Sequence, residues 1–236
     1  MSLSYDRIVF FGRRLADYRR FFRLLEDDFK GAILDVAAGS ASFNAEVTAQ
    51  GGRVTSVDPI YRFSNARVAL QTRLDFAHTQ ARAEASPNAF QLAQVGEFKD
   101  LWALRQAASE RFLTDFPGGQ ATGRYRGGTL PALDPADGAF DLVLCGHFLF
   151  LYADRLDEAF HRASLRELLR VARREVRIYP LVSLDGTRHP YLPSLRAGLA
   201  AAGIVSEIVP LDYEVLRGAN EMLLLRKPRS RSSVMP

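Results

Sequence analysis

Apolar residues along the chain follow two alternating patterns, short continuous runs and stripes at spacings of three and four residues. Each run predicts a buried strand and each stripe predicts an amphipathic helix. The runs lie at 32–36, 53–58, 140–146 and 176–183. The stripes that alternate with them lie at 40–50, 156–169 and 191–202. This alternation predicts an α/β protein, with a doubly wound, mostly parallel sheet covered by helices on both faces.

The end of the chain departs from this alternation. Two further strands, over 204–211 and 221–227, are joined through Gly218 without room for a helix. Such a connection is typical of a hairpin, so the last strand should run antiparallel to its neighbours. With a weakly marked strand near 124–130, the sheet has seven strands. Residues 228–236 are polar and without periodicity, and we expect them to form a flexible tail.

Two helical regions lie outside the regular pattern. Apolar residues at helical spacing over 8–25 predict an amphipathic helix, so residues 1–30 should form an N-terminal helical cap. Residues 62–120 carry two helical stripes where a simple crossover needs about a dozen residues and its helix. We interpret 62–120 as a helical insertion that forms a lid over the ligand site. The chain, 1–236, is expected to be a single domain.

Composition sets limits on location and metal binding. With 47% hydrophobic and 25% charged residues, the chain has the composition of an ordinary globular protein. No apolar stretch is long enough to span a membrane, and the N-terminus becomes charged too early for a secretory signal. Cys145 is the one cysteine, which excludes an internal disulfide and a cysteine-based zinc site. We therefore expect a cytoplasmic protein with no metal and no membrane partner.

The excess of basic over acidic residues is small. The net charge is +4, and the basic residues are almost all arginines spread along the chain. This balance permits a polyanionic partner without arguing for one.

The candidate chemistry lies where strands end, because ligands of parallel α/β sheets bind outside the carboxyl ends of the strands. The first end reads ILDVAAGSASF, residues 33–43, and contains the single glycine Gly39. A dinucleotide fingerprint has three glycines for close approach of a pyrophosphate. Small residues with one glycine suit a ligand without a pyrophosphate. Asp35 can face that ligand or cap the following helix.

The second strand end supplies an acidic side chain. Asp58 lies 23 residues after Asp35, where a carboxylate can accept both hydroxyls of a ribose. The alternative is that it only caps the turn before Pro59, and its place in the motif series favours ribose binding. A ribose without a pyrophosphate points to S-adenosylmethionine.

Three motifs in order, ILDVAAGSASF, VTSVDPIY and LPALDPADGAFDLVLCGHFLFLY, resemble those of class I S-adenosylmethionine-dependent methyltransferases, in the style of ubiquinone and menaquinone biosynthesis enzymes. The resemblance covers about residues 31–183 and implies a Rossmann-like methyltransferase fold. It implies that the Asp35-to-Gly39 turn faces the methionine part, Asp58 binds the ribose, and Ile60 or Tyr61 packs on adenine. The candidate cofactor-binding residues are Asp35, Ala37, Gly39, Asp58, Pro59, Ile60, Cys145, His147 and Phe148.

His147 is the candidate catalytic residue. It follows the third strand, where the resemblance places the transferred methyl group, and it could remove a proton from the acceptor. It could equally hold the methionine part or stabilise the loop. Among the other histidines, His189 lies in a loop that could border the substrate, and His161 lies on an amphipathic helix where we expect partial exposure.

The preferred hypothesis is a methyltransferase that acts on a small or medium-sized acceptor. One alternative is an RNA or DNA methyltransferase that binds phosphates through arginines such as Arg13, Arg14, Arg19 and Arg20. Another is a non-catalytic S-adenosylmethionine-binding protein, which is favoured by alanines at 37 and 41 where the family commonly has glycine. The oligomeric state is not predicted.

Overall fold

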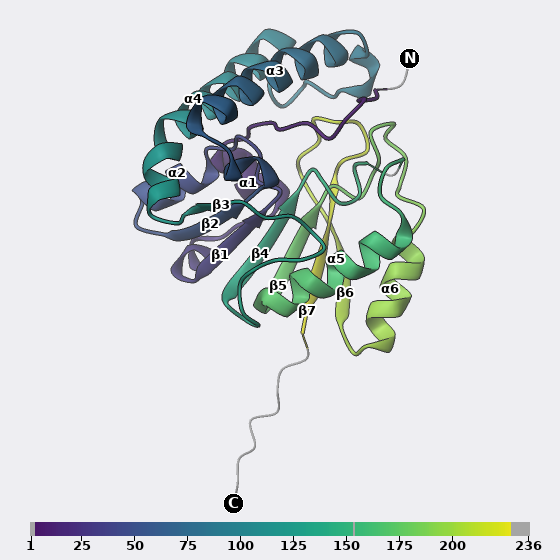
Figure 1. The fold of residues 1–236 in the computed structure, drawn as a ribbon. Helices are drawn as coiled ribbons and strands as arrows, with labels where there is room; N and C mark the ends of the chain where they lie inside the picture. Colours follow the sequence, from purple (N-terminus) through teal and green to yellow (C-terminus); the bar gives the residue numbers. More distant parts are fainter. Residues whose placement is uncertain (1–2, 153, 228–236) are drawn as a thin grey trace, which may run out of the picture.

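The computed structural model describes residues 3–152 and 154–227, so the predicted tail at 228–236 lies outside the described residues. Helices cover both faces of a seven-stranded sheet (Figure 1). The strands are β1 (Ala32–Val36), β2 (Arg53–Val57), β3 (Tyr125–Arg126), β4 (Phe140–Gly146), β5 (Ala172–Tyr179), β6 (Val205–Pro210) and β7 (Glu221–Arg226). The helices are α1 (Leu15–Phe21), α2 (Phe43–Ala49), α3 (Asn65–Glu84), α4 (Phe98–Ala121), α5 (Glu158–Val171) and α6 (Leu192–Ala201).

The strand order, β3-β2-β1-β4-β5-β7-β6, confirms the predicted fold class. Strands β1 to β5 are parallel to one another, whereas β7 lies between β5 and β6 and is antiparallel to both. A mostly parallel sheet with an antiparallel last strand is the arrangement of the Rossmann-like methyltransferase fold.

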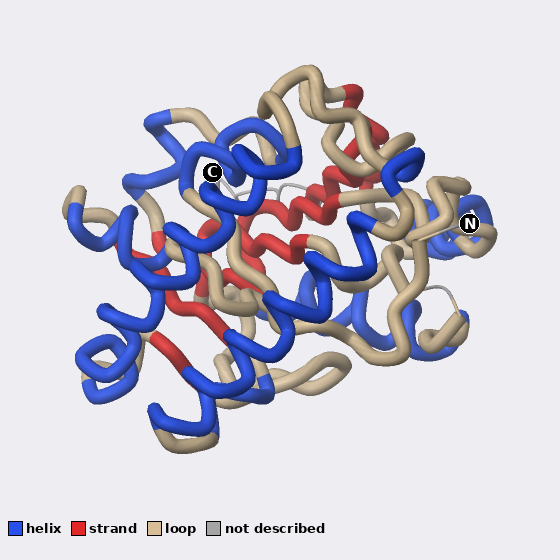
Figure 2. The backbone as a smooth tube through the Cα atoms, turned by 90° about the horizontal axis from the view of Figure 1, so that it is seen from above, coloured by secondary structure: helices blue, strands red, loops and turns tan. Residues whose placement is uncertain are grey.

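Successive residues of each strand point to opposite faces of the sheet, and both faces are apolar. Ile33 belongs to the core under α1 and α2, whereas Leu34 belongs to the core under α5 and α6. Seen from above, the strands cross the middle of the molecule between these helical layers (Figure 2). The central strands are therefore buried on both sides, which leaves their ends as the places where a ligand can reach them.

The N-terminal helix is shorter than predicted. Residues 8–14 are extended, and only Leu15–Phe21 is helical. Backbone groups of this extended segment make hydrogen bonds to residues distant in sequence instead of helical ones. The Phe10 N–H donates to Asp75, and the Arg13 carbonyl accepts from the Ser42 N–H. Gly12 also packs so closely on Ser40 that a Cβ atom would lie 2.4 Å from its carbonyl oxygen. We call residues 8–14 the strap.

The region 62–120 contains two long helices. Helix α3 packs on α4 and crosses the top of the molecule in Figure 1, next to the strap. Helix α4 also packs on α2 and β3, beside the sheet. By sequence alone, Pro117, Gly118 and Gly119 predict the end of the second helix; this is wrong, because α4 continues through Pro117 to Ala121. Gly119 lies directly against the Tyr125 ring, and this packing extends the helix past the proline.

Candidate functional site

The carboxyl ends of β1, β2 and β4 meet at one edge of the sheet, because these neighbouring strands are parallel. The turn after β1 has left-handed backbone at Ala37 (φ 56°) and Gly39 (φ 60°). The Gly39 N–H donates to Asp58 Oδ2 (3.1 Å), and the Ile60 N–H donates to Asp58 Oδ1 (3.1 Å). Asp58 therefore ties the turn after β1 to the turn after β2.

A cavity of about 240 Å³ lies beside this carboxylate. We call it the sheet-edge cavity. It contains five of the candidate residues, Ala37, Asp58, Pro59, Ile60 and Phe148. The other residues that line it are Ile8, Val9, Phe10, Val36, Gln71, Asp75, Gly128, Thr129 and Leu130.

Two carboxylates line the sheet-edge cavity. Burial raises the pKa of Asp58 to about 6, and the negative charge of Asp75 contributes in the same direction. Asp75, on α3, accepts from the Phe10 N–H (2.8 Å) and from the Arg7 guanidinium (2.8 Å). Asp58 is thus the carboxylate of this cavity that has no cationic partner among the described residues, since Asp75 pairs with Arg7 and holds the strap.

Four of the nine candidate residues lie outside the sheet-edge cavity: Asp35, Gly39, Cys145 and His147. Asp35 is buried below the turn, where the hydroxyls of Tyr18 and Ser56 donate to it. Burial raises the pKa of Asp35 to about 8. Cys145 is fully buried within β4, and burial raises the pKa of its thiol to about 12. Gly39 is covered by the strap, with the Phe11 carbonyl on it.

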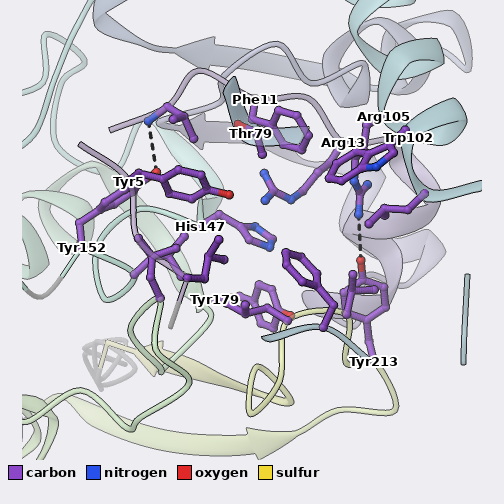
Figure 3. A pocket seen from close by; sticks show the side chains of 18 residues that line it. Tyr5, Phe11, Arg13, Thr79, Trp102, Arg105, His147, Tyr152, Tyr179 and Tyr213 are labelled. Carbon is purple, nitrogen blue, oxygen red and sulfur yellow. Dashed lines mark hydrogen bonds between the residues drawn. The ribbon is translucent and has the colours of Figure 1, made fainter. Parts of the chain in front are cut away.

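A second cavity, of about 80 Å³, lies on the other side of the strap (Figure 3). We call it the aromatic cavity. Its wall consists of Leu3, Tyr5, Val9, Phe11, Arg13, Thr79, Phe90, Leu101, Trp102, Arg105, His147, Leu151, Tyr152, Tyr179, Leu184, Tyr213, Val215 and Leu216.

His147 points into the aromatic cavity (Figure 3). Its backbone is left-handed (φ 55°), and its N–H donates to the Tyr179 carbonyl (2.6 Å). The ring packs edge-on against Phe21 and Tyr179, and its buried Nδ1 has no hydrogen-bond partner. Burial, together with the charges of Arg13 and Arg105, holds the pKa of His147 well below its usual value. The imidazole is therefore neutral at pH 7, and the same surroundings disfavour its protonated form.

The other two histidines discussed above lie away from both cavities. His161 is fully buried, so the expected partial exposure is wrong, and its ring contacts the carbonyls of Asp157 and Leu149. His189 is also buried and packs against His161.

The structure adds cavity residues that the motifs do not indicate. Arg105 and Trp102 reach the aromatic cavity from α4, and Arg13 reaches it from the strap. One signal was present in the sequence, because Arg105 is a charged residue within an otherwise apolar stripe. Arg13 had no such signal, since its place depends on the strap being extended.

Among the described residues, no helix is long and apolar enough to cross a membrane, and no group of three or more acidic, histidine or cysteine side chains could hold a metal ion.

No protein-family model matches the chain. The uncharacterized protein MJ0045 of Methanocaldococcus jannaschii is 33% identical over 230 residues, which are 95% of this chain and 99% of that protein. Solved structures give looser likenesses. The magnesium protoporphyrin IX methyltransferase of Synechocystis PCC 6803 is 13% identical with a TM-score of 0.42, over 84% of this chain and 70% of that one. A methyltransferase of Methanosarcina mazei is 13% identical with a TM-score of 0.43, over 84% of this chain and 92% of that one. The strand order of the protein itself, rather than these likenesses, defines its fold.

Proposed function

The chain belongs to the family of the uncharacterized protein MJ0045 of Methanocaldococcus jannaschii, and we propose that it transfers a methyl group from S-adenosylmethionine to a small acceptor. The observation that carries this proposal is the position of Asp58. Asp58 directly follows β2. Its carboxylate ties the turns after β1 and β2 together and lines a cavity at the carboxyl edge of the sheet. A ligand with vicinal hydroxyls suits such a site.

The sheet-edge cavity fits the nucleoside part of the cofactor. Asp58 would accept from the ribose hydroxyls, and Ile60 with Pro59 would supply an apolar surface for adenine. Ala37 and Phe148 line the same cavity from the ends of β1 and β4. The methionine part would lie toward Gly39, which requires the strap to move. When bound, the cofactor supplies an electrophilic methyl group on a sulfonium.

The aromatic cavity is the proposed acceptor site. The neighbouring residues His147 and Phe148, at the end of β4, line the aromatic cavity and the sheet-edge cavity respectively. The two cavities are therefore adjacent, and the strap between them has to be displaced before a donor and an acceptor can be aligned, which is a large part of catalysis. His147, neutral and with Nδ1 free, is the proposed general base for the acceptor proton.

Titration calorimetry with S-adenosylhomocysteine tests the proposal. Binding by the folded protein supports it, and the absence of binding at millimolar ligand rejects it.

A second function is favoured by one observation: the strap fills the Gly39 turn. A protein that binds the cofactor only to sense it could keep such a strap. Incubation with methyl-labelled S-adenosylmethionine and a small-molecule extract distinguishes the two functions. Label transferred to a small molecule identifies an enzyme, whereas binding without transfer identifies a sensor.

A further inference from the structure

The aromatic cavity has a cationic wall. Two arginines line it, and none of the described residues in its wall is an aspartate or a glutamate. The positive charge of Arg105 is paired within the protein: its Nη1 donates to Asp17 Oδ2 (2.7 Å), and its Nη2 donates to the Tyr213 hydroxyl (3.3 Å). The positive charge that remains belongs to Arg13.

Arg13 has no anionic partner among the described residues. Its guanidinium lies 5.6 Å from the centre of the Phe11 ring and points into the cavity (Figure 3). Its Nε is buried and makes no hydrogen bond. Burial also lowers the pKa of Arg13. The side chain is half-buried, so its charge lies against a mostly apolar wall without a counter-ion among the described residues, and a bound anion would supply one.

Other polar groups in the same wall are also without partners. Trp102 Nε1, Thr79 Oγ1 and His147 Nδ1 are buried and unbonded, and all three residues line the aromatic cavity. Buried polar atoms usually have a hydrogen-bond partner, so their concentration in one cavity indicates that a ligand supplies it. The rest of the wall is aromatic or aliphatic, which requires a ligand with an apolar body.

We propose that the aromatic cavity binds a small organic acid, with its carboxylate on the Arg13 guanidinium and its apolar part among the aromatic rings. This assignment rests on the proposed function, in which the cavity holds the methyl acceptor. A guanidinium pairs with a planar carboxylate through two parallel hydrogen bonds. One unbalanced positive charge matches a monoanion. A dianionic phosphate would leave a second charge buried in an apolar cavity.

Size limits the acid. The cavity of about 80 Å³ is smaller than the engineered cavity of about 150 Å³ that holds benzene in another protein. Short-chain acids fit as the wall stands, and an aromatic acid requires the strap or the wall to shift.

Calorimetry with butyrate, benzoate and their neutral amides tests the proposal. At least one acid should bind the wild type tenfold or more tightly than its amide. Arg13→Gln should abolish this preference, and Arg13→Lys should keep part of it. Arg67→Gln, which removes an exposed arginine of α3, should leave the preference intact. Circular dichroism and S-adenosylhomocysteine titration verify that each variant is folded.

Equal affinity for acid and amide in the wild type would overturn the proposal, even if Arg13→Gln failed to fold. An acid preference that survived Arg13→Gln would also overturn it, as would tighter binding of inorganic phosphate than of either acid. A different result would reject the proposed function alone. If S-adenosylhomocysteine does not bind but the acid preference is present, the methyltransferase proposal is rejected and the organic-acid site stands.

Discussion

The carbonyl oxygen of Phe11 lies 2.5 Å from the position that a Cβ atom on Gly39 would occupy. The strap therefore rests directly on the turn after β1, and glycine is the residue that allows this contact. A ligand group can occupy this turn only after the strap is displaced.

We expect Asp58→Ala to weaken S-adenosylhomocysteine binding by roughly ten- to a hundredfold. The change removes charged hydrogen bonds to the ribose, which contribute about 1.5 to 3 kcal/mol. Calorimetry on the variant measures the loss. Asp134→Ala, which removes an exposed carboxylate outside both cavities, should bind as the wild type does. Unchanged affinity in Asp58→Ala would remove Asp58 from the cofactor site.

The buried carboxyl of Asp35 predicts a pH-dependent stability. Its pKa is raised to about 8 in the folded protein, so the folded state binds more protons than the unfolded chain between about pH 4 and 8. The free energy of unfolding should therefore fall as pH rises through this range, by at most about 1.4 kcal/mol per pH unit from this group. Asp35→Asn should lose this component of the slope.

Urea denaturation of both proteins at pH 5, 6, 7 and 8 measures the slopes. Asp134→Asn serves as the control, because that side chain is exposed. Parallel profiles for the wild type and Asp35→Asn would contradict the prediction.

Ligand binding at the Gly39 turn should loosen the strap. Helix α3 holds the strap and the residues just before it. Asp75 accepts from the Phe10 N–H and from Arg7, and Arg82 donates to the Ser4 carbonyl. Saturation with S-adenosylhomocysteine should raise amide hydrogen exchange at Phe10, and Asp75→Asn should raise it without ligand. Exchange in α5 serves as the internal control. If exchange at Phe10 is unchanged at saturation, the methionine part does not enter the turn.

Mobility of the predicted lid is tested in the same experiment. Because lids come from segments of low local stability, residues 62–120 should exchange faster than the central strands. Equal protection of the two with and without ligand would argue against a lid.

Nucleic-acid binding should be weak and unselective, since the net charge is only +4. The arginines of the N-terminal region are partly engaged within the protein: Arg14 contacts Asp17, and Arg19 pairs with Glu26. An enzyme that engages about six phosphates should lose roughly a thousandfold in affinity between 50 and 200 mM salt. Fluorescence anisotropy with cellular RNA and duplex DNA over this range measures the effect. Tight, selective binding at physiological salt would favour the nucleic-acid alternative.

The sequence predicts the sheet well, because buried parallel strands leave continuous apolar runs and the link through Gly218 excludes a crossover helix. It also predicts that Asp58 and Ala37 lie at the carboxyl edge of the sheet, since neighbouring parallel strands end at the same edge. The strap could not be predicted in the same way. Ile8 and Phe11 have helical spacing, but their backbone is extended because Asp75 and Ser42, distant in sequence, bind it. The place of Arg13 in the aromatic cavity follows from that extended backbone, so the sequence does not predict it.

Neighbouring residues of the strap face opposite ways: Ile8 and Phe10 line the sheet-edge cavity, Phe11 and Arg13 line the aromatic cavity, and Val9 reaches both. One backbone movement therefore reshapes both binding sites at once. A ligand that displaces the strap at one proposed site would then change the affinity of the other site, and thermodynamic reciprocity would make the two effects equal in size. Cooperativity between the proposed cofactor and acceptor sites would thus arise within a single peptide segment.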